Sequence, residues 1–134
     1  GDGYDLPNIK KLVEELKVEE TAHLIGFKEN PYPYFVQADY YILSSRYEGY
    51  PTVLFEAMVL AKPIIATDVS GVREMLNNGE LGYIIDNEEE AIYDGMKYFI
   101  QNPEIAQKYQ QIIEGKIQPF ELGNAVNSIE KYLN

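Results

Sequence analysis

The chain of 134 residues contains no cysteine, no tryptophan and a single histidine. Without cysteine, neither a disulfide framework nor a thiolate metal site can form, and such a composition suits a reducing cytoplasm. No apolar run approaches the ~20 residues that a membrane-spanning helix requires, and the N-terminus lacks the pattern of a secretory signal. The composition therefore predicts one soluble domain that covers residues 1–134.

Basic residues are also few, since 11 Lys and Arg stand against 22 Asp and Glu and the formal net charge is -11. An excess of negative charge repels a phosphate backbone, which excludes nucleic acid as an expected partner. A small anionic ligand is still compatible with this charge, because backbone amides, a helix N-terminus or a few cations can meet it locally.

Apolar periodicity predicts alternating strands and helices. Strands are expected at residues 21–27, 40–45, 62–68 and 81–86, and helices at 6–17, 53–61, 70–79, 87–100, 103–115 and 122–133, with room for one short helix between 29 and 39. Ser70 is the expected N-cap of the helix over 70–79. This alternation is typical of βαβ units and predicts an α/β fold with a Rossmann-like, doubly wound parallel sheet.

The loop "SSRYEGYPT" at residues 44–52 follows one of these strands, in the position where such sheets bind ligands. Glu48 and Glu56 stand on either side of its glycine and proline. The pattern Ser45-x-x-Glu48 matches a helix capping box, but Gly49 and Pro51 would interrupt the first turns of a helix capped at Ser45. The helix is therefore expected to start after Pro51.

In that case Thr52 is the expected N-cap, and the amides of Val53, Leu54 and Phe55 would point out of the helix end. Free amides and a helix dipole suit an anion such as phosphate. Glu56, about one turn inside the helix, could then accept hydrogen bonds from a diol beside that phosphate. A structural loop with two surface glutamates explains the same spacing equally well.

The loop resembles one in retaining glycosyltransferases of family four, which have the GT-B fold. The stretch from Glu48 to Glu56 fits the E-x7-E pattern of that family. Further similar segments occur in the family's order and spacing: "GDG" at 1–3, "LIGF" at 24–27, "ADYYILSS" at 38–45, "EGYPTVLFEAM" at 48–58, "KPIIATDVSGVREML" at 62–76 and "GYIID" at 82–86. The chain thus looks like most of the C-terminal, nucleotide-sugar-binding half of such an enzyme.

The resemblance implies a role for each matching residue. The glutamate that matches Glu56 binds the donor ribose, and the one that matches Glu48 lies at the donor sugar and its diphosphate, as the expected catalytic residue. Loop amides hold phosphate oxygens, and the turn at Gly26 and Phe27 lies against the nucleobase. The donor-binding residues implied are Gly26, Phe27, Glu48, Gly49, Tyr50, Pro51, Thr52, Val53 and Glu56.

The resemblance also implies what the parent enzyme does. It would transfer a sugar from a nucleotide diphosphate sugar, preferably a UDP-sugar, to a glycan or lipid-linked acceptor, with retention and without a bound metal or cofactor. Bacterial capsule or other polysaccharide assembly, in the cytoplasm or at the inner face of the membrane, is the expected setting.

Compared with the family, the chain is expected to be truncated at its N-terminus. The strand and loop that carry an arginine and a lysine for the donor diphosphate would precede Gly1, as would the acceptor-binding N-terminal domain. The fragment alone is therefore expected to be inactive. Loss of central strands would leave open sheet edges, and these favour self-association.

Other readings account for some of the same residues. His23 has no second histidine near it, so an ordinary structural role is expected. Arg73 is expected to pair with a neighbouring acid, whereas Arg46 could equally meet a donor phosphate. A receiver domain needs a lysine after a late strand, but Lys62 precedes one. A non-catalytic α/β binding or assembly module is the alternative function.

Overall fold

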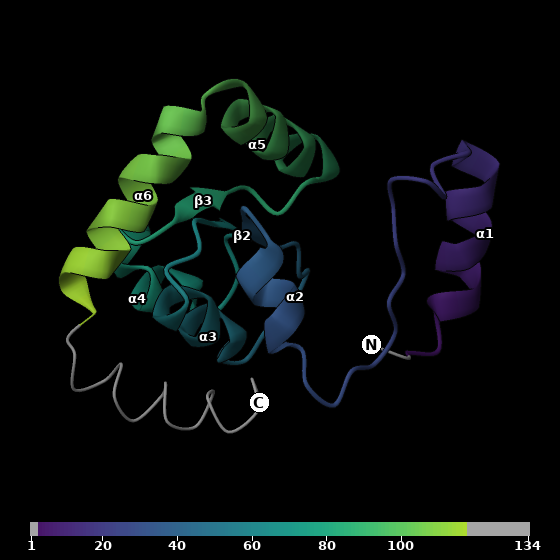
Figure 1. The fold of residues 1–134 in the computed structure, drawn as a ribbon, viewed down its shortest axis with the longest axis horizontal. Helices are drawn as coiled ribbons and strands as arrows, with labels where there is room; N and C mark the ends of the chain where they lie inside the picture. The colour runs from purple at the N-terminus through teal and green to yellow at the C-terminus, as the bar shows by residue number, and fades with distance from the viewer. Residues whose placement is uncertain (1–2, 118–134) are drawn as a thin grey trace. The chain divides into compact units, whose positions relative to one another are not determined.

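The computed structural model describes residues 3–117, and the helix expected over 122–133 lies outside them. The chain divides into two compact units, Gly1–Pro31 and Tyr32–Asn134. The first unit contains helix α1 (Leu6–Leu16). Among the described residues, the second unit contains the sheet and helices α2 to α6 (Figure 1).

Three parallel strands form the sheet of the second unit, in the order β1 (Tyr41–Leu43), β2 (Ile64–Thr67), β3 (Tyr83–Ile85). In register, Ile42 of β1 faces Ile65 of β2, and Ala66 of β2 faces Ile84 of β3. All four residues of β2 are buried, as expected of a central parallel strand covered on both faces. The predicted α/β fold with a parallel sheet is confirmed.

Successive residues of β2 point to opposite faces and separate two hydrophobic clusters. Ile64 and Ala66 belong to one cluster with α3 (Val53–Val59) and α4 (Val72–Met75). Ile65 belongs to the other, with Phe99 of α5 (Glu89–Gln101). Helix α6 (Pro103–Lys116) contributes to both clusters. Figure 1 shows α3 and α4 on one side of the strands and α5 on the other.

The predicted helix over residues 70–79 is wrong in two respects. Its N-cap is Gly71 at φ 82°, where a serine side chain was expected to cap the helix from position 70. It also ends at Met75, and a 3-10 turn, η1 (Asn77–Gly79), follows it. Asn77 and Asn78 adopt positive φ values of 47° and 54°, which break the α-helical hydrogen bonding.

Helix α1 is amphipathic, as its periodicity predicts, but it contains no buried residue. Lys17 ends it in a left-handed conformation at φ 55°. The strand predicted over residues 21–27 does not form, since residues 22–28 have no regular secondary structure and run as an extended segment (Figure 1). An apolar segment becomes a strand only by pairing, and within residues 3–117 no strand pairs with it.

A short helix also precedes β1. Helix α2 (Tyr32–Gln37) lies in the interval where one was expected. Lys62 fixes its C-terminal end, because its Nζ donates to the carbonyls of Val36 and Ala38 at 2.8 and 2.9 Å. Phe35 of α2 packs against the cluster that contains α3. Among residues 3–117, no helix is long and apolar enough to cross a membrane.

Gly82 provides a test of packing beside β3. A Cβ atom at Gly82 would lie 2.9 Å from Leu76 Cδ1 and 3.1 Å from Ile64 Cβ. We expect Gly82→Ala to lower the free energy of unfolding by about 1–3 kcal/mol, measured by urea denaturation, because the core must shift to admit the methyl group. In the control Gly115→Ala, the added methyl meets no atom within 4 Å, and a gain of up to about 1 kcal/mol is expected in helix α6. Equal stability of Gly82→Ala and wild type would contradict this packing.

Candidate functional site

The loops that follow the three strands meet at one edge of the sheet. Parallel strands place their carboxyl ends together, so the loop after β1 (residues 44–52) adjoins those after β2 and β3. Asn87, after β3, donates from Nδ2 to the carbonyl of Arg46 at 3.0 Å. Thr67, at the end of β2, donates from Oγ1 to the carbonyl of Ser45 at 2.6 Å. The loop after β1 is thus hydrogen-bonded both to the end of β2 and to the loop after β3.

Gly71 supports the same loop from the turn after β2. Its φ is 82°, a conformation that side chains rarely adopt. A Cβ atom there would lie 3.1 Å from Pro51 Cδ and 3.2 Å from the Gly49 carbonyl oxygen. Sequence reasoning missed both Thr67 and Gly71 as supports of the loop. A serine-glycine pair after a strand predicts a turn, but the surface it packs against depends on the tertiary fold.

Glu48 is half-buried in this loop and has a local partner. Ser45 donates from Oγ to Glu48 Oε1 at 2.6 Å. In a capping box each of these side chains would bond the backbone amide of the other residue, whereas here the two side chains bond each other and the helix begins only at Val53. The expectation that Gly49 and Pro51 prevent a helix from starting at Ser45 is therefore confirmed.

Glu56 lies in the first turn of α3 and is also half-buried. The hydroxyl group of Tyr32, the first residue of α2, donates to Glu56 Oε1 at 3.5 Å. No other side-chain partner of Glu56 occurs among residues 3–117, so its second oxygen can accept hydrogen bonds from a ligand.

Tyr41, the first residue of β1, connects the two glutamates electrostatically. Burial of the phenol, followed by the charges of Glu56 and Glu48, raises the pKa of Tyr41 from 10.0 to about 12. Both carboxylates therefore lie within electrostatic reach of one phenol. Sequence reasoning did not identify Tyr32 and Tyr41 as neighbours of the two glutamates, and only the fold shows them to be so.

The predicted row of free amides at the start of α3 is largely wrong. The amide of Leu54 donates to the Pro51 carbonyl and that of Phe55 to the Thr52 carbonyl, each at 3.0 Å. Thr52 occupies the N-cap position but makes no side-chain capping bond. The reason is that Thr52 already has a right-handed helical conformation, with φ -54° and ψ -24°, so the first amides find carbonyls three residues back. Among the three amides, only that of Val53 has no backbone acceptor in the described residues.

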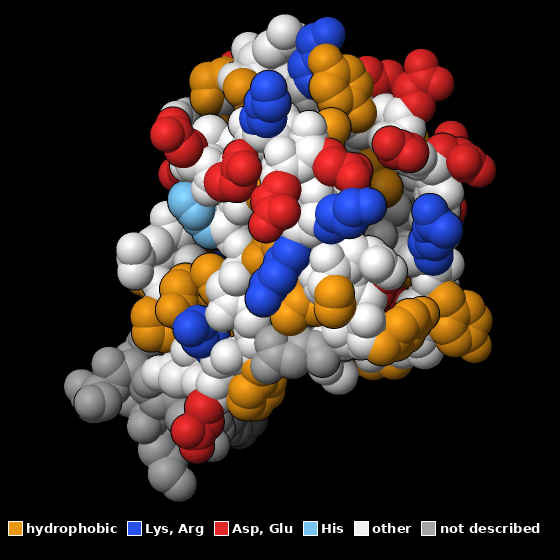
Figure 2. Space-filling view, turned by 90° about the vertical axis from the view of Figure 1, so that its right-hand side faces the viewer, with side chains coloured by type: hydrophobic (Ala, Val, Ile, Leu, Met, Phe, Trp, Pro, Cys, Tyr) orange, Lys and Arg blue, Asp and Glu red, His pale blue; other side chains and the backbone are white. Residues whose placement is uncertain are grey.

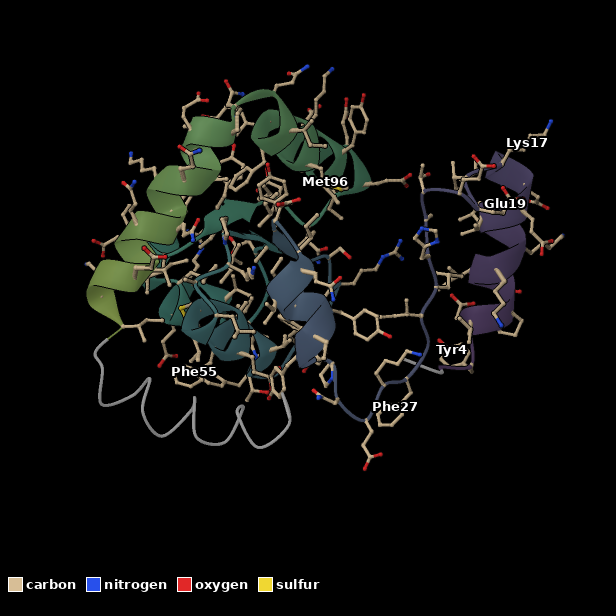
Figure 3. The ribbon with its side chains drawn as sticks, viewed as in Figure 1. Tyr4, Lys17, Glu19, Phe27, Phe55 and Met96 are labelled. Carbon is tan, nitrogen blue, oxygen red and sulfur yellow. The ribbon has the colours of Figure 1, made fainter. Side chains whose placement is uncertain are left out.

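The remaining expected donor residues fall in different places. Tyr50 is exposed and contacts the Gly71 turn. Gly26 and Phe27 belong to the N-terminal unit, where Gly26 has φ 67° and Phe27 lies on the extended segment (Figure 3). Figure 3 also shows Phe55 projecting from the side of α3 that faces away from β2.

Charged groups near the loops behave differently from one another. Arg73 donates from Nε to Asp68 Oδ2 at 2.9 Å, which confirms the expected pairing. This hydrogen bond raises the pKa of the Arg73 guanidinium above its usual value. Arg46 is exposed, and it forms no ion pair with an acid among residues 3–117. Acidic and basic side chains are interspersed on the face shown in Figure 2.

Neither a metal-binding group nor the hollow beside α5 coincides with this loop in the described residues. Within residues 3–117, no three His, Asp or Glu side chains group so as to hold a metal ion. A hollow of about 600 Å³ lies instead between β3 and α5, where Tyr83, Asp94 and Tyr98 line it. None of the expected donor-binding residues lines that hollow. The candidate site is therefore distinct from that hollow and consists of the loop after β1 and the first turn of α3.

Comparison with known proteins identifies the family. The family model described as glycosyl transferases group 1 matches residues 1–116. The chain therefore belongs to this family. Its relatives include an N-acetylgalactosamine-N,N'-diacetylbacillosaminyl-diphospho-undecaprenol 4-alpha-N-acetylgalactosaminyltransferase of Campylobacter jejuni, which is 27% identical over 99% of this chain and 37% of that protein. The Vi polysaccharide biosynthesis protein VipC/TviE of Salmonella typhi is 32% identical over 70% of this chain and 16% of that protein.

Solved structures agree on the fold. A glycosyltransferase from Rickettsia africae superposes with a TM-score of 0.74 at 22% identity, over 100% of this chain and 39% of that one. The sucrose-phosphate synthase of Thermosynechococcus elongatus gives a TM-score of 0.72 at 20% identity, over 99% of this chain and 35% of that one. The chain thus spans well under half the length of these proteins, and its α/β architecture is that of a part of the GT-B fold.

The raised pKa of Tyr41 predicts a loss of stability in alkali. Above pH 10 the phenol ionises in the unfolded chain but not in the folded one, so unfolding becomes more favourable as the pH rises toward about 12. We expect the free energy of unfolding to fall by about 1–2 kcal/mol over this interval, a value reduced for the partial exposure of the ring.

Tyr41→Phe should remove most of this loss in urea denaturation series at pH 9 to 12. Tyr47→Phe, which deletes an exposed phenol, is the matched control. The pKa of Tyr109 is also raised by burial, so a smaller slope should remain. An unchanged slope in Tyr41→Phe would show that the two glutamates and burial do not hold this proton.

Proposed function

We propose that the chain is the donor-binding part of a retaining glycosyltransferase. The parent enzyme transfers a sugar from a nucleotide diphosphate sugar, preferably a UDP-sugar, to a glycan or lipid-linked acceptor. The observation that carries this proposal is the placement of both glutamates at the carboxyl end of a parallel strand, with Glu48 in the loop after β1 and Glu56 in the first turn of α3, the helix that follows this loop. Membership of the glycosyltransferase family supports it independently.

In this proposal Glu56 binds the donor ribose. Its half-buried carboxylate presents one oxygen to Tyr32 and leaves the other for a ligand. A ribose diol offers two hydroxyl donors, and hydrogen bonds to an ionised acceptor are about twice as strong as neutral ones. A carboxylate held on the first turn of a helix suits this ligand better than it suits a phosphate.

Glu48 then lies at the donor sugar and its diphosphate, as the catalytic residue. Ser45 holds one of its oxygens at 2.6 Å, which limits the positions the carboxylate can adopt. The loop residues Gly49 to Thr52 provide the surface for the diphosphate, with the amide of Val53 as a free donor. Arg46 is the nearest cation in the sequence of the loop, and its exposed side chain can approach an anion.

The relatives suggest the acceptor and the setting. The Campylobacter jejuni protein is named for a diphospho-undecaprenol substrate, and the Salmonella typhi protein for the biosynthesis of Vi polysaccharide. A lipid-linked or polymeric glycan acceptor, assembled in the cytoplasm or at the inner face of a membrane, fits both names. Gly26 and Phe27 would lie against the nucleobase in the assembled enzyme. Residues 1–134 alone would bind the donor without turnover.

Calorimetric titration with UDP, GDP and their sugar conjugates tests the proposal. We expect one nucleotide to bind weakly, with a dissociation constant of ~1 mM or about -4 kcal/mol, because few cations adjoin the loop. Glu56→Ala should weaken this binding by at least about tenfold, since it deletes the ribose acceptor. The control Glu90→Ala removes an equal charge from exposed α5 and should bind like wild type.

Two outcomes would overturn the assignment. If no nucleotide binds to a chain that circular dichroism shows to be folded, the donor site is not formed by these residues. If Glu56→Ala and Glu90→Ala bind a nucleotide equally well, the site is elsewhere. Either result favours the alternative of a binding or assembly module.

A further inference from the structure

We propose that Tyr32 is a positioning residue that orients the Glu56 carboxylate for a ribose diol. This inference rests on the proposed function, since it deepens the role of Glu56. The Tyr32 hydroxyl donates to Glu56 Oε1 across 24 positions of sequence, at 3.5 Å. It is the one side-chain hydrogen bond to Glu56 among residues 3–117, and at 3.5 Å it is long, so it favours one orientation of the half-buried carboxylate without fixing it.

Aromatic contacts hold the ring of Tyr32 in place. It stands at the start of α2, and its ring lies 6.4 Å from that of Phe35, at 54°. Phe35 in turn stacks on Tyr41 of β1 at 5.1 Å and 15°. Offset aromatic pairs of this kind restrict ring orientation. The three rings therefore connect the hydroxyl of Tyr32 to the central sheet.

The other end of α2 is fixed as well. Lys62, between α3 and β2, donates to the carbonyls of Val36 and Ala38. Glu56 stands on α3, the helix that precedes Lys62. Two contacts thus connect α2 with α3 and the residues that follow it: the hydrogen bonds of Lys62 and the Tyr32–Glu56 hydrogen bond. Together they keep the Tyr32 hydroxyl near the Glu56 carboxylate.

The direction of the hydrogen bond suits this role. Toward a carboxylate oxygen the Tyr32 hydroxyl can only donate. One oxygen of Glu56 accepts this hydrogen bond, and the other is left for the ligand. Because a hydrogen-bond acceptor that is already oriented loses less conformational freedom on binding, the effect appears as affinity for the diol.

The test measures UDP binding by calorimetry to wild type, Tyr32→Phe, Glu56→Ala and the double variant. Tyr32→Phe keeps the ring and deletes only the hydroxyl, so we expect binding about three- to tenfold weaker with an unchanged thermal midpoint. In the Glu56→Ala background the same substitution should have no effect, because the hydroxyl acts through the carboxylate. Tyr93→Phe, on α5, is the control for loss of a tyrosine hydroxyl.

A second ligand separates positioning from general packing. 2′-Deoxy-UDP lacks one hydroxyl of the diol, so Tyr32→Phe should weaken its binding less than that of UDP. If both ligands lose affinity equally, Tyr32 acts only through packing and the inference is wrong. A second readout needs no ligand: the ¹³Cδ resonance of Glu56 should shift in Tyr32→Phe and stay in place in Tyr93→Phe.

The possible failures are distinguishable. If wild type binds UDP, Glu56→Ala loses it and Tyr32→Phe binds normally, the inference fails and the proposed function stands. If the folded wild-type chain binds no nucleotide, the proposed function fails and the positioning role fails with it. An unmoved Glu56 resonance in Tyr32→Phe overturns the inference whatever the binding result.

Discussion

The site depends on three short strands running parallel. Parallel pairing is the constraint that places the carboxyl ends of β1, β2 and β3 at one edge, so that the loops after them contact each other. Each strand has only three or four residues. Strand pairing therefore fixes the position of the strand ends but not the conformation of the loops that follow them. The buried hydroxyl of Thr67 donates to the carbonyls of Leu43 and Ser45. These hydrogen bonds attach the start of the loop after β1 to the end of β2.

The sheet and most helices could be predicted from the sequence because their signals are local. Continuous apolar runs mark β1, β2 and β3, and Pro51 and Pro103 mark where α3 and α6 begin. The segment at residues 21–27 has the same apolar character but lacks a partner within residues 3–117, so it stays extended. A strand is a property of two segments, and composition describes only one of them.

The candidate site was only partly predictable for a similar reason. The spacing of Glu48 and Glu56 pointed to the correct loop, whereas the contacts of these residues come from distant positions. Tyr32 reaches Glu56 and Thr67 reaches Ser45 over more than twenty residues. The expected free amides of Leu54 and Phe55 failed because backbone amides bond locally wherever a carbonyl is available. Spacing cannot show which carbonyls these will be.

That last failure changes how an anionic ligand would be recognised. With two of the three helix-end amides already bonded, and α3 only seven residues long, little backbone charge is available for a phosphate. The surrounding chain carries a net charge of -11, which opposes any anion further. Affinity for a nucleotide sugar would then come from hydroxyl groups that donate to Glu48 and Glu56. In the proposed function, Glu48 and Glu56 would select the ribose and the sugar, and the backbone amides at the start of α3 would contribute little to holding the diphosphate.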